Sequence, residues 1–257
     1  MALTVAASGG GTSVTDDTTL PISVGAAGFS IGDVMVIAIA AANSGTNGVA
    51  RTVTIADNAS GTTNVYSQRG PTGNQTAGTA SAGASQFWFE CPITTALTST
   101  EVVTITFSGN LSEKAASSIR LQPAASESVI YSAVGTASVG AGATTHDAAT
   151  VSVADTYTIF AAAAIETDDA TTGDSDTTNG SWSAAFGGLA DSGTDPNAMR
   201  LFGQWKTATA TGDQAWACTT ASGRDSARNY IIYYSGTPPA AGALNTMIRS
   251  NCVIAVP

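Results

Sequence analysis

Charged side chains are scarce in this sequence. They make up 11% of its 257 residues, and 9 Lys and Arg stand against 19 Asp and Glu, for a formal net charge of −10. A typical globular domain has about 25% charged residues. A nucleic-acid-binding protein needs a basic face that displaces counterions from phosphate, so the shortage of cations excludes that class. The two lysines, Lys114 and Lys206, are too few for long amphipathic helices with Glu–Lys pairs.

Cysteine and histidine are also rare. Cys91, Cys218 and Cys252 are widely spaced and form no CxxC pair, which excludes a readable zinc site or thioredoxin-like motif. Cys91 and Cys218 lie in apolar, strand-like segments, and we expect both to be reduced core thiols. A single disulfide remains the alternative, although three cysteines make a poor disulfide framework.

Long hydrophobic runs are missing as well. The longest, residues 34–42, is about nine residues long, whereas a transmembrane helix needs about 20. The first residues have neither the basic region nor the apolar region of a secretory signal. We therefore expect a soluble chain that is made in a cytoplasm and does not bind a membrane.

The sequence contains many short segments whose composition is typical of β-strands. Short runs rich in β-branched and aromatic residues are separated by clusters of Gly, Asn, Asp and Ser, a pattern typical of a β-sandwich rather than of βαβ units. We predict an all-β, antiparallel, jelly-roll-like sandwich. In the first half of the chain the predicted strands are residues 19–24, 33–40, 51–55, 85–90, 101–107 and 118–121.

The second half repeats this plan. Residues 155–162 correspond to residues 33–40 with an offset of about 122, and Gly223 corresponds to Gly109 with an offset of about 114, so loops are shorter in the second half. The alanine-rich run at residues 160–165 has helical propensity, but the repeat requires a strand there. We expect two internally repeated halves that complete one sandwich; two separate small sandwiches are the alternative.

The predicted domain boundaries follow from this repeat. The duplicated sandwich spans residues 15–236, with halves at about 15–125 and 143–236. Residues 1–14 are small and rich in glycine, and residues 237–257 begin with a proline pair that cannot lie inside a central strand. We interpret these end segments as extended N-terminal and C-terminal arms.

No catalytic constellation is evident. The single histidine, His146, precedes Asp147 in a Gly/Thr-rich connector, and adjacent strand residues point to opposite faces, so we expect a solvated loop histidine rather than a catalytic base. A glycosidase needs two carboxylates in one cleft, and only Glu90 among the glutamates lies beside an aromatic residue, Phe89. We predict that the chain is not an enzyme. The other glutamates are Glu101, Glu113, Glu127 and Glu166.

Two further features have competing interpretations. The acidic segment 166–180 contains Asp174, Asp176 and Asn179, which partly resemble a calcium-binding loop but lack its spacing and closing Glu. We expect a solvated loop that binds no metal, with calcium as the alternative. Trp182 could be a platform for a sugar ring, whereas the other tryptophans lie on predicted strands and pack in the core: Trp88, Trp205 and Trp216.

Several segments together resemble the β-sandwich structural proteins of tailed-phage virions. These segments are residues 32–39, 55–61, 64–66, 87–89, 102–107 and 230–236. The resemblance implies a non-enzymatic capsid decoration (cement) protein of the virion, assembled in the host cytoplasm. Its partners would be the major capsid protein or other virion proteins, and a homo-oligomer is possible. The alternative is a tail-fibre or head-fibre module that binds a receptor or carbohydrate. The resemblance implies no site residues, cofactor or metal.

Overall fold

The computed structural model describes residues 3–42, 51–61, 64–76, 83–135, 138–153, 156–192, 198–208 and 212–236. These ranges contain β-strands and no helix. The sheets are antiparallel and pack on one another, which confirms the predicted all-β antiparallel sandwich.

The first half of the chain forms two sheets. In the larger sheet, nearly every residue of β3 and β7 is buried, so this sheet is covered on both faces. This first central sheet has the order β1 (Thr4–Ser13), β9 (Lys114–Gln122), β3 (Val34–Ala42), β7 (Gly83–Pro92) and β5 (Ser67–Gln68), with β6 (Gly73–Thr76) also on β7. The first outer sheet has the order β2 (Asp17–Ser23), β8 (Val102–Leu111) and β4 (Val53–Asp57).

The second half has the same strand order. Its central sheet contains β10 (Ser128–Val134), β16 (Gly212–Gly236), β12 (Tyr157–Ile165), β15 (Met199–Ala208) and β14 (Phe186–Ala190). The first part of the long β16 also pairs with β11 (Ser138–Val153) and β13 (Thr171–Thr172), and these three form the second outer layer. β16 therefore combines the roles of β8 and β9. In both halves, strands adjacent in sequence mostly alternate between the two layers, as in a jelly roll.

The pairing register reproduces the repeat. Ile37 pairs with Ser118 between β3 and β9, and Ile159 pairs with Ile232 between β12 and β16. Ile159 follows Ile37 by 122 positions and Ile232 follows Ser118 by 114 positions, which are the offsets seen in the sequence. Asp155, one of the sequence anchors, lies outside the described residues. The repeat is thus carried into the hydrogen-bond register and is not only a similarity of composition.

A β-bulge is repeated as well. The register of β1 shifts between Ala7 and Gly9, and that of β10 shifts between Tyr131 and Ala133, so one serine is extra in each strand. In the first half this serine, Ser8, donates a hydrogen bond to the Val24 carbonyl at 2.6 Å. A bulge bends and twists its strand, and here it directs β1 toward the outer sheet.

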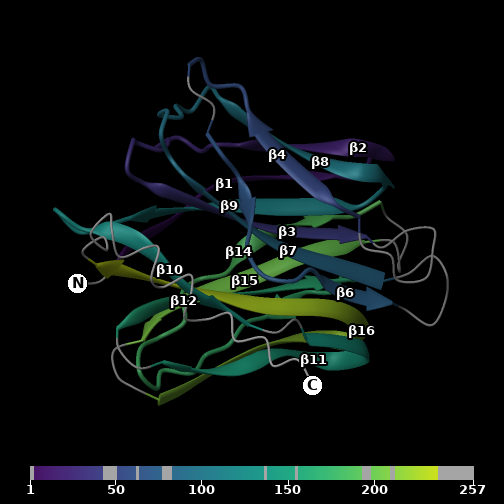
Figure 1. Ribbon diagram of the computed structural model, residues 1–257. Coiled ribbons are helices and arrows are strands. Elements are labelled where there is room, and N and C mark those ends of the chain that lie inside the picture. Colours follow the sequence, from purple (N-terminus) through teal and green to yellow (C-terminus); the bar gives the residue numbers. More distant parts are fainter. Residues whose placement is uncertain are drawn as a thin grey trace, which may run out of the picture.

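Three hydrophobic cores separate four layers, which Figure 1 shows stacked from the first outer sheet to β11. The first core, with Ile37 and Phe107, fills the space between the first outer and central sheets. The second, with Trp88 and Tyr233, lies between the two central sheets. The third, with Trp216, lies between the second central sheet and its outer layer. Each half therefore encloses a core of its own, the first and the third, as in the alternative of two small sandwiches, and the second core joins the halves.

The ends differ from the expected arms. Residues 4–13 are not an arm, because β1 pairs along its length with β9 and belongs to the first half. The second half begins at β10, before the expected boundary at residue 143. Glycine-rich composition suggested a free segment, but here it permits close backbone contact: a Cβ on Gly9 would lie 1.9 Å from the Ser23 carbonyl oxygen. The expected C-terminal arm, residues 237–257, lies outside the described residues.

The close contact between β1 and β2 generates a prediction. Replacing Gly9 with Ala should lower the free energy of unfolding by about 1–3 kcal/mol, because the new methyl group overlaps the Ser23 carbonyl. Urea denaturation measures this loss. The control is Thr12→Val on the exposed side of the same strand, which should change stability by less than about 0.5 kcal/mol. Equal stability of the two variants would contradict this account of the strand.

Candidate functional site

His146 is buried, not solvated. It lies on β11, is 0% exposed, and pairs across the strands with Cys218. Its Nδ1 lies 2.8 Å from the Ser226 hydroxyl, and its Nε2 lies 2.9 Å from the Thr220 hydroxyl. The expectation of a solvated loop histidine is therefore wrong: the connector forms a strand, and its partners come from a distant part of the sequence.

The hydrogen bonds define the state of this imidazole. Thr220 donates its hydroxyl proton to the Ser222 carbonyl, so it accepts from Nε2–H of His146, and Nδ1 accepts from Ser226. Burial, and then the nearby Arg228 guanidinium, lower the pKa of His146 to about 4. Ser226 is also fully buried. This serine–histidine contact is consequently closed to substrate and serves to join β11 to β16.

The acidic segment is held by donors from the protein. Asp174 accepts hydrogen bonds from the backbone N–H groups of Asp176 and Ala217 at 2.8 and 2.9 Å. Gln204 on β15 accepts from the Asp174 N–H and donates to the Asp174 carbonyl, which fixes the loop on the sheet. Gln204 also accepts from the indole N–H of Trp216 at 3.0 Å.

A lysine supplies the cation of this loop. Lys206 is 1% exposed, and its Nζ lies 3.0 Å from Asp176 Oδ2 and 5.5 Å from the ring centroid of Trp182. The Thr178 N–H and then the Lys206 ammonium hold the pKa of Asp176 down to about 2. No three His, Cys, Asp or Glu side chains gather as metal ligands in the described ranges. Sequence reasoning missed Lys206 and Gln204 because both lie on a strand 30 residues after the aspartates they bind.

Trp182 is buried rather than presented to solvent. It is 9% exposed and packs edge-to-face on Trp216, with ring centroids 6.5 Å apart. A stacking platform for a sugar needs an exposed ring face. The suggestion of Trp182 as a sugar platform is therefore wrong.

Glu90 joins the two halves. It lies on β7, is 5% exposed, and is bound by Arg69 from the first half and by the Tyr233 hydroxyl from the second half, at 2.8 Å. Arg69 also lies over the ring of Tyr131, 4.6 Å from its centroid, and Tyr131 packs edge-to-face on Tyr233. Both carboxylate oxygens of Glu90 thus have partners, so the carboxylate is committed to the interface between the halves.

Three other glutamates also accept hydrogen bonds, two from residues nearby in sequence and one from a residue 108 positions away. Glu101 accepts from the Thr98 backbone N–H, Glu113 accepts from Ser112, and Glu127 accepts from Ser235. These contacts lie on different connections of the fold. They give each of the three a role in fixing a turn or strand end.

The two described cysteines are free and buried, as expected. Burial is the main cause that raises the pKa of each thiol to about 12, so neither is a nucleophile at neutral pH. Cys252 lies outside the described residues. Beside Cys91, Asp57 accepts hydrogen bonds from Asn64 and Tyr66, which ties the turn after β4 to the first core.

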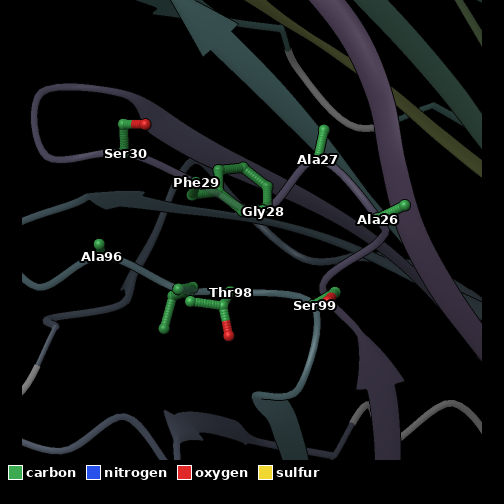
Figure 2. Close-up of a pocket in the computed structure, with 9 residues that line it drawn as sticks. Ala26, Ala27, Gly28, Phe29, Ser30, Ala96, Thr98 and Ser99 are labelled. Carbon is green, nitrogen blue, oxygen red and sulfur yellow. The ribbon is translucent and has the colours of Figure 1, made fainter.

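A small hollow opens at one end of the first half. Figure 2 shows it between the turn at residues 26–30 and the segment at residues 96–99. Its volume is about 280 Å³. Phe29 and Leu97 close its floor by exchanging backbone hydrogen bonds of 2.7 and 2.9 Å. The residues that line it include the hydroxyls of Ser30, Thr98 and Ser99 but no acid, base or thiol.

Cations are withdrawn from the surface. Within the described residues, every Lys and Arg side chain is buried or half-buried, and Lys114 is 0% exposed with its Nζ bound to Asp17 and to three backbone carbonyls. Apart from half-buried arginines such as Arg69, the described surface presents hydroxyls, methyl groups, amides and carboxylates. It lacks the basic patch that binding to phosphate would need.

Comparisons of the chain with protein-family models, with curated proteins and with solved structures found no match. The described part of the chain contains no helix that could span a membrane. Among the candidate side chains, His146, Glu90 and both described cysteines are buried in internal contacts, whereas Asp147 and Asp176 are partly in solvent.

The buried histidine predicts a pH dependence of stability. The imidazole pKa is about 4 when folded and about 6.5 when unfolded, so between these values the unfolded chain binds more protons. The contribution of His146 to the free energy of unfolding should therefore be fully present above pH 6.5. It should fall by on the order of 3 kcal/mol as the pH is lowered toward 4. Urea unfolding from pH 7 to 4, compared with His146→Gln, isolates this contribution.

The lowered pKa of His146 can also be measured directly in the wild-type protein. Because His146 is the single histidine, its ring protons can be followed by NMR without assignment. Titration near pH 6.5 in the native protein would refute the buried, neutral state.

The acidic segment predicts indifference to calcium. Chelation should leave the melting temperature unchanged, because the aspartates already accept N–H donors and the Lys206 ammonium. Asp176→Asn should lower the melting temperature more than Lys206→Met, since it leaves a buried ammonium without its carboxylate, whereas the methionine leaves only a solvated carboxylate. Calorimetry with and without chelator measures both. A calcium-dependent melting temperature, or the reverse order of the two variants, would overturn this interpretation.

Proposed function

We propose that this chain is a non-enzymatic structural protein of a phage virion that decorates and stabilises an assembled capsid. Its partners are the major capsid protein or other virion proteins, and its place of work is the virion. The proposal builds on the resemblance of the sequence segments and on the doubled jelly roll, an architecture that recurs in viral capsid domains.

The observation that carries the proposal is that the reactive side chains are buried and make contacts between strands of the fold itself. The described side chains best suited to acid–base or nucleophilic chemistry are buried within the fold: His146, Glu90, Cys91 and Lys206. An active site instead needs such groups in a cleft that substrate can enter. This distribution favours a rigid body whose function is to bind.

To stabilise a capsid, a decoration protein needs only to bind it and requires no catalytic group. A shell under pressure gains stability from any ligand that binds the assembled lattice and not the free subunits. Every described Lys and Arg side chain is buried or half-buried. The proposal places the contacts on shape and on uncharged groups, with little dependence on salt. An extended N-terminal arm could have added a strand to a capsid subunit, but residues 4–13 are already paired with β9 inside the first half and are not available for this.

The fibre-module alternative loses its main support. It expects Trp182 and the acidic segment at an exposed loop tip. Part of the acidic segment is exposed, for example Asp176, but the Trp182 ring is buried against Trp216. No described aromatic residue is among the large exposed hydrophobic side chains, which are Val14, Ile31, Val65 and Val102.

Binding to particles tests the proposal. Capsids assembled from the major capsid protein of the same genome, without this chain, are mixed with the purified protein and separated on a density gradient. The chain should sediment with capsids, not with unassembled capsid protein, and should raise the temperature at which the capsids open. Bound protein should be retained as salt rises to about 1 M, where the Debye length is about 3 Å. Absence of binding, or loss of binding at high salt, would refute the proposal.

A further inference from the structure

From Thr19 of β2 across β8 and β4, the outward face of the first outer sheet carries no charged side chain. β8 and β4 along their length, and β2 from Thr19 onward, turn alternate side chains into the first core and outward. Their outward residues are Thr19, Pro21 and Ser23 on β2, Val102, Thr104, Thr106, Ser108 and Asn110 on β8, and Thr54 and Ala56 on β4. We call this set the threonine face. In a chain of net charge −10, this uncharged part of three adjacent strands forms a distinct surface.

The register arranges this face in rows. Thr106 on the middle strand pairs with Thr19 on one side and with Thr54 on the other, so three threonines lie in line across the sheet. Adjacent strands are about 4.8 Å apart, which places the hydroxyl and methyl groups of this row side by side. Two acids lie on these strands. Asp57, at the end of β4, accepts hydrogen bonds from Asn64 and Tyr66. Asp17, with 44% of its side chain exposed, lies beyond a register shift and is bound to Lys114.

The opposite end of the molecule has the same geometry but different chemistry. In the second outer layer, Thr219 on β16 pairs with Thr145 on β11 and with Thr172 on β13, which reproduces the threonine row. Here, however, Asp147 and Asp213 are exposed on the same strands, and Asp147 keeps 69% of its side chain in solvent. Figure 1 shows the first outer sheet and β11 at opposite sides of the stack.

We propose that the threonine face is the surface that docks on the capsid, and that the acidic second outer layer faces solvent. This inference rests on the proposed function. Its partner is a capsid surface of uncharged side chains and backbone groups, because a charged partner surface would find no counter-charge on this face and would lose its hydration. Hydroxyls and methyl groups can be buried against such a surface with their hydrogen bonds retained.

The charge distribution also selects between the two ends. An acidic end brought against a protein surface would desolvate Asp147, which is 3.7 Å from its nearest cation, Arg228, and stays hydrated in the free protein. The threonine face has no such cost. The duplicated fold thus offers two similar flat layers, of which only one is chemically suited to a dry, uncharged contact.

A matched pair of variants tests the orientation. Thr106→Asp places a carboxylate in the centre of the threonine face, and Thr219→Asp does the same in the centre of the acidic layer, each between two threonines on neighbouring strands. In the capsid-binding assay, Thr106→Asp should weaken binding about tenfold or more, because the carboxylate is desolvated without a partner. Thr219→Asp should bind like the wild type. Circular dichroism and thermal melting establish that both variants are folded.

Thr106→Val separates packing from charge. It keeps the shape of the side chain and should retain most of the binding, which shows that the loss in Thr106→Asp comes from the carboxylate. If the wild type binds capsids and Thr106→Asp binds equally well, or if Thr219→Asp is the weaker variant, the orientation is wrong although the decoration function stands. If the wild type binds no capsid but self-associates in sedimentation experiments, and Thr106→Asp abolishes this, the face is a contact between copies and the proposal is overturned.

Discussion

The contact between the two central sheets is the constraint on which the rest of the structure depends. Each central sheet has two apolar faces, and a half of the chain can cover only one of them with its own outer layer. The second face is buried only when the other half packs against it. Alanines such as Ala38, Ala162 and Ala164 let the sheets approach closely, and Trp88 and Tyr233 fill the wider parts of the gap. Neither half is therefore a complete sandwich in water, and stacking is a condition of folding rather than an addition to it.

Polar groups at this contact determine how the halves align. Apolar packing is largely non-directional, so two flat sheets could slide over one another at little cost. Glu90 removes this freedom, since its two oxygens are bound by Arg69 of one half and Tyr233 of the other. A buried carboxylate contributes little net stability when its desolvation is counted. Its effect here is to specify one arrangement of the two sheets, because any displacement would leave a buried charge unpaired.

The sequence was informative where local pattern and repeat agreed. The offsets of 122 and 114 recur in the strand register, and the alanine-rich run at residues 160–165 is a strand, as the repeat required, because it lies between two apolar cores. β1 escaped prediction because its glycines look like a flexible segment, whereas their function is to let two backbones meet. His146 escaped it because its partners, Ser226 and Thr220, lie 80 and 74 residues away and leave no local signal.

Duplication explains how one fold can be both uniform inside and different outside. The inner faces of the repeats must remain complementary, since each depends on the other for burial, and they have kept the same register and even the same bulge. The outer layers are released from this requirement, because a threonine or an aspartate on their outward side leaves the cores intact. The charged residues of the second layer and the uncharged residues of the first are thus both compatible with the same stack. A repeated protein whose halves meet through their central sheets has, by this geometry, two opposite faces that can diverge independently, and differences between those faces mark where a partner distinguishes one end from the other.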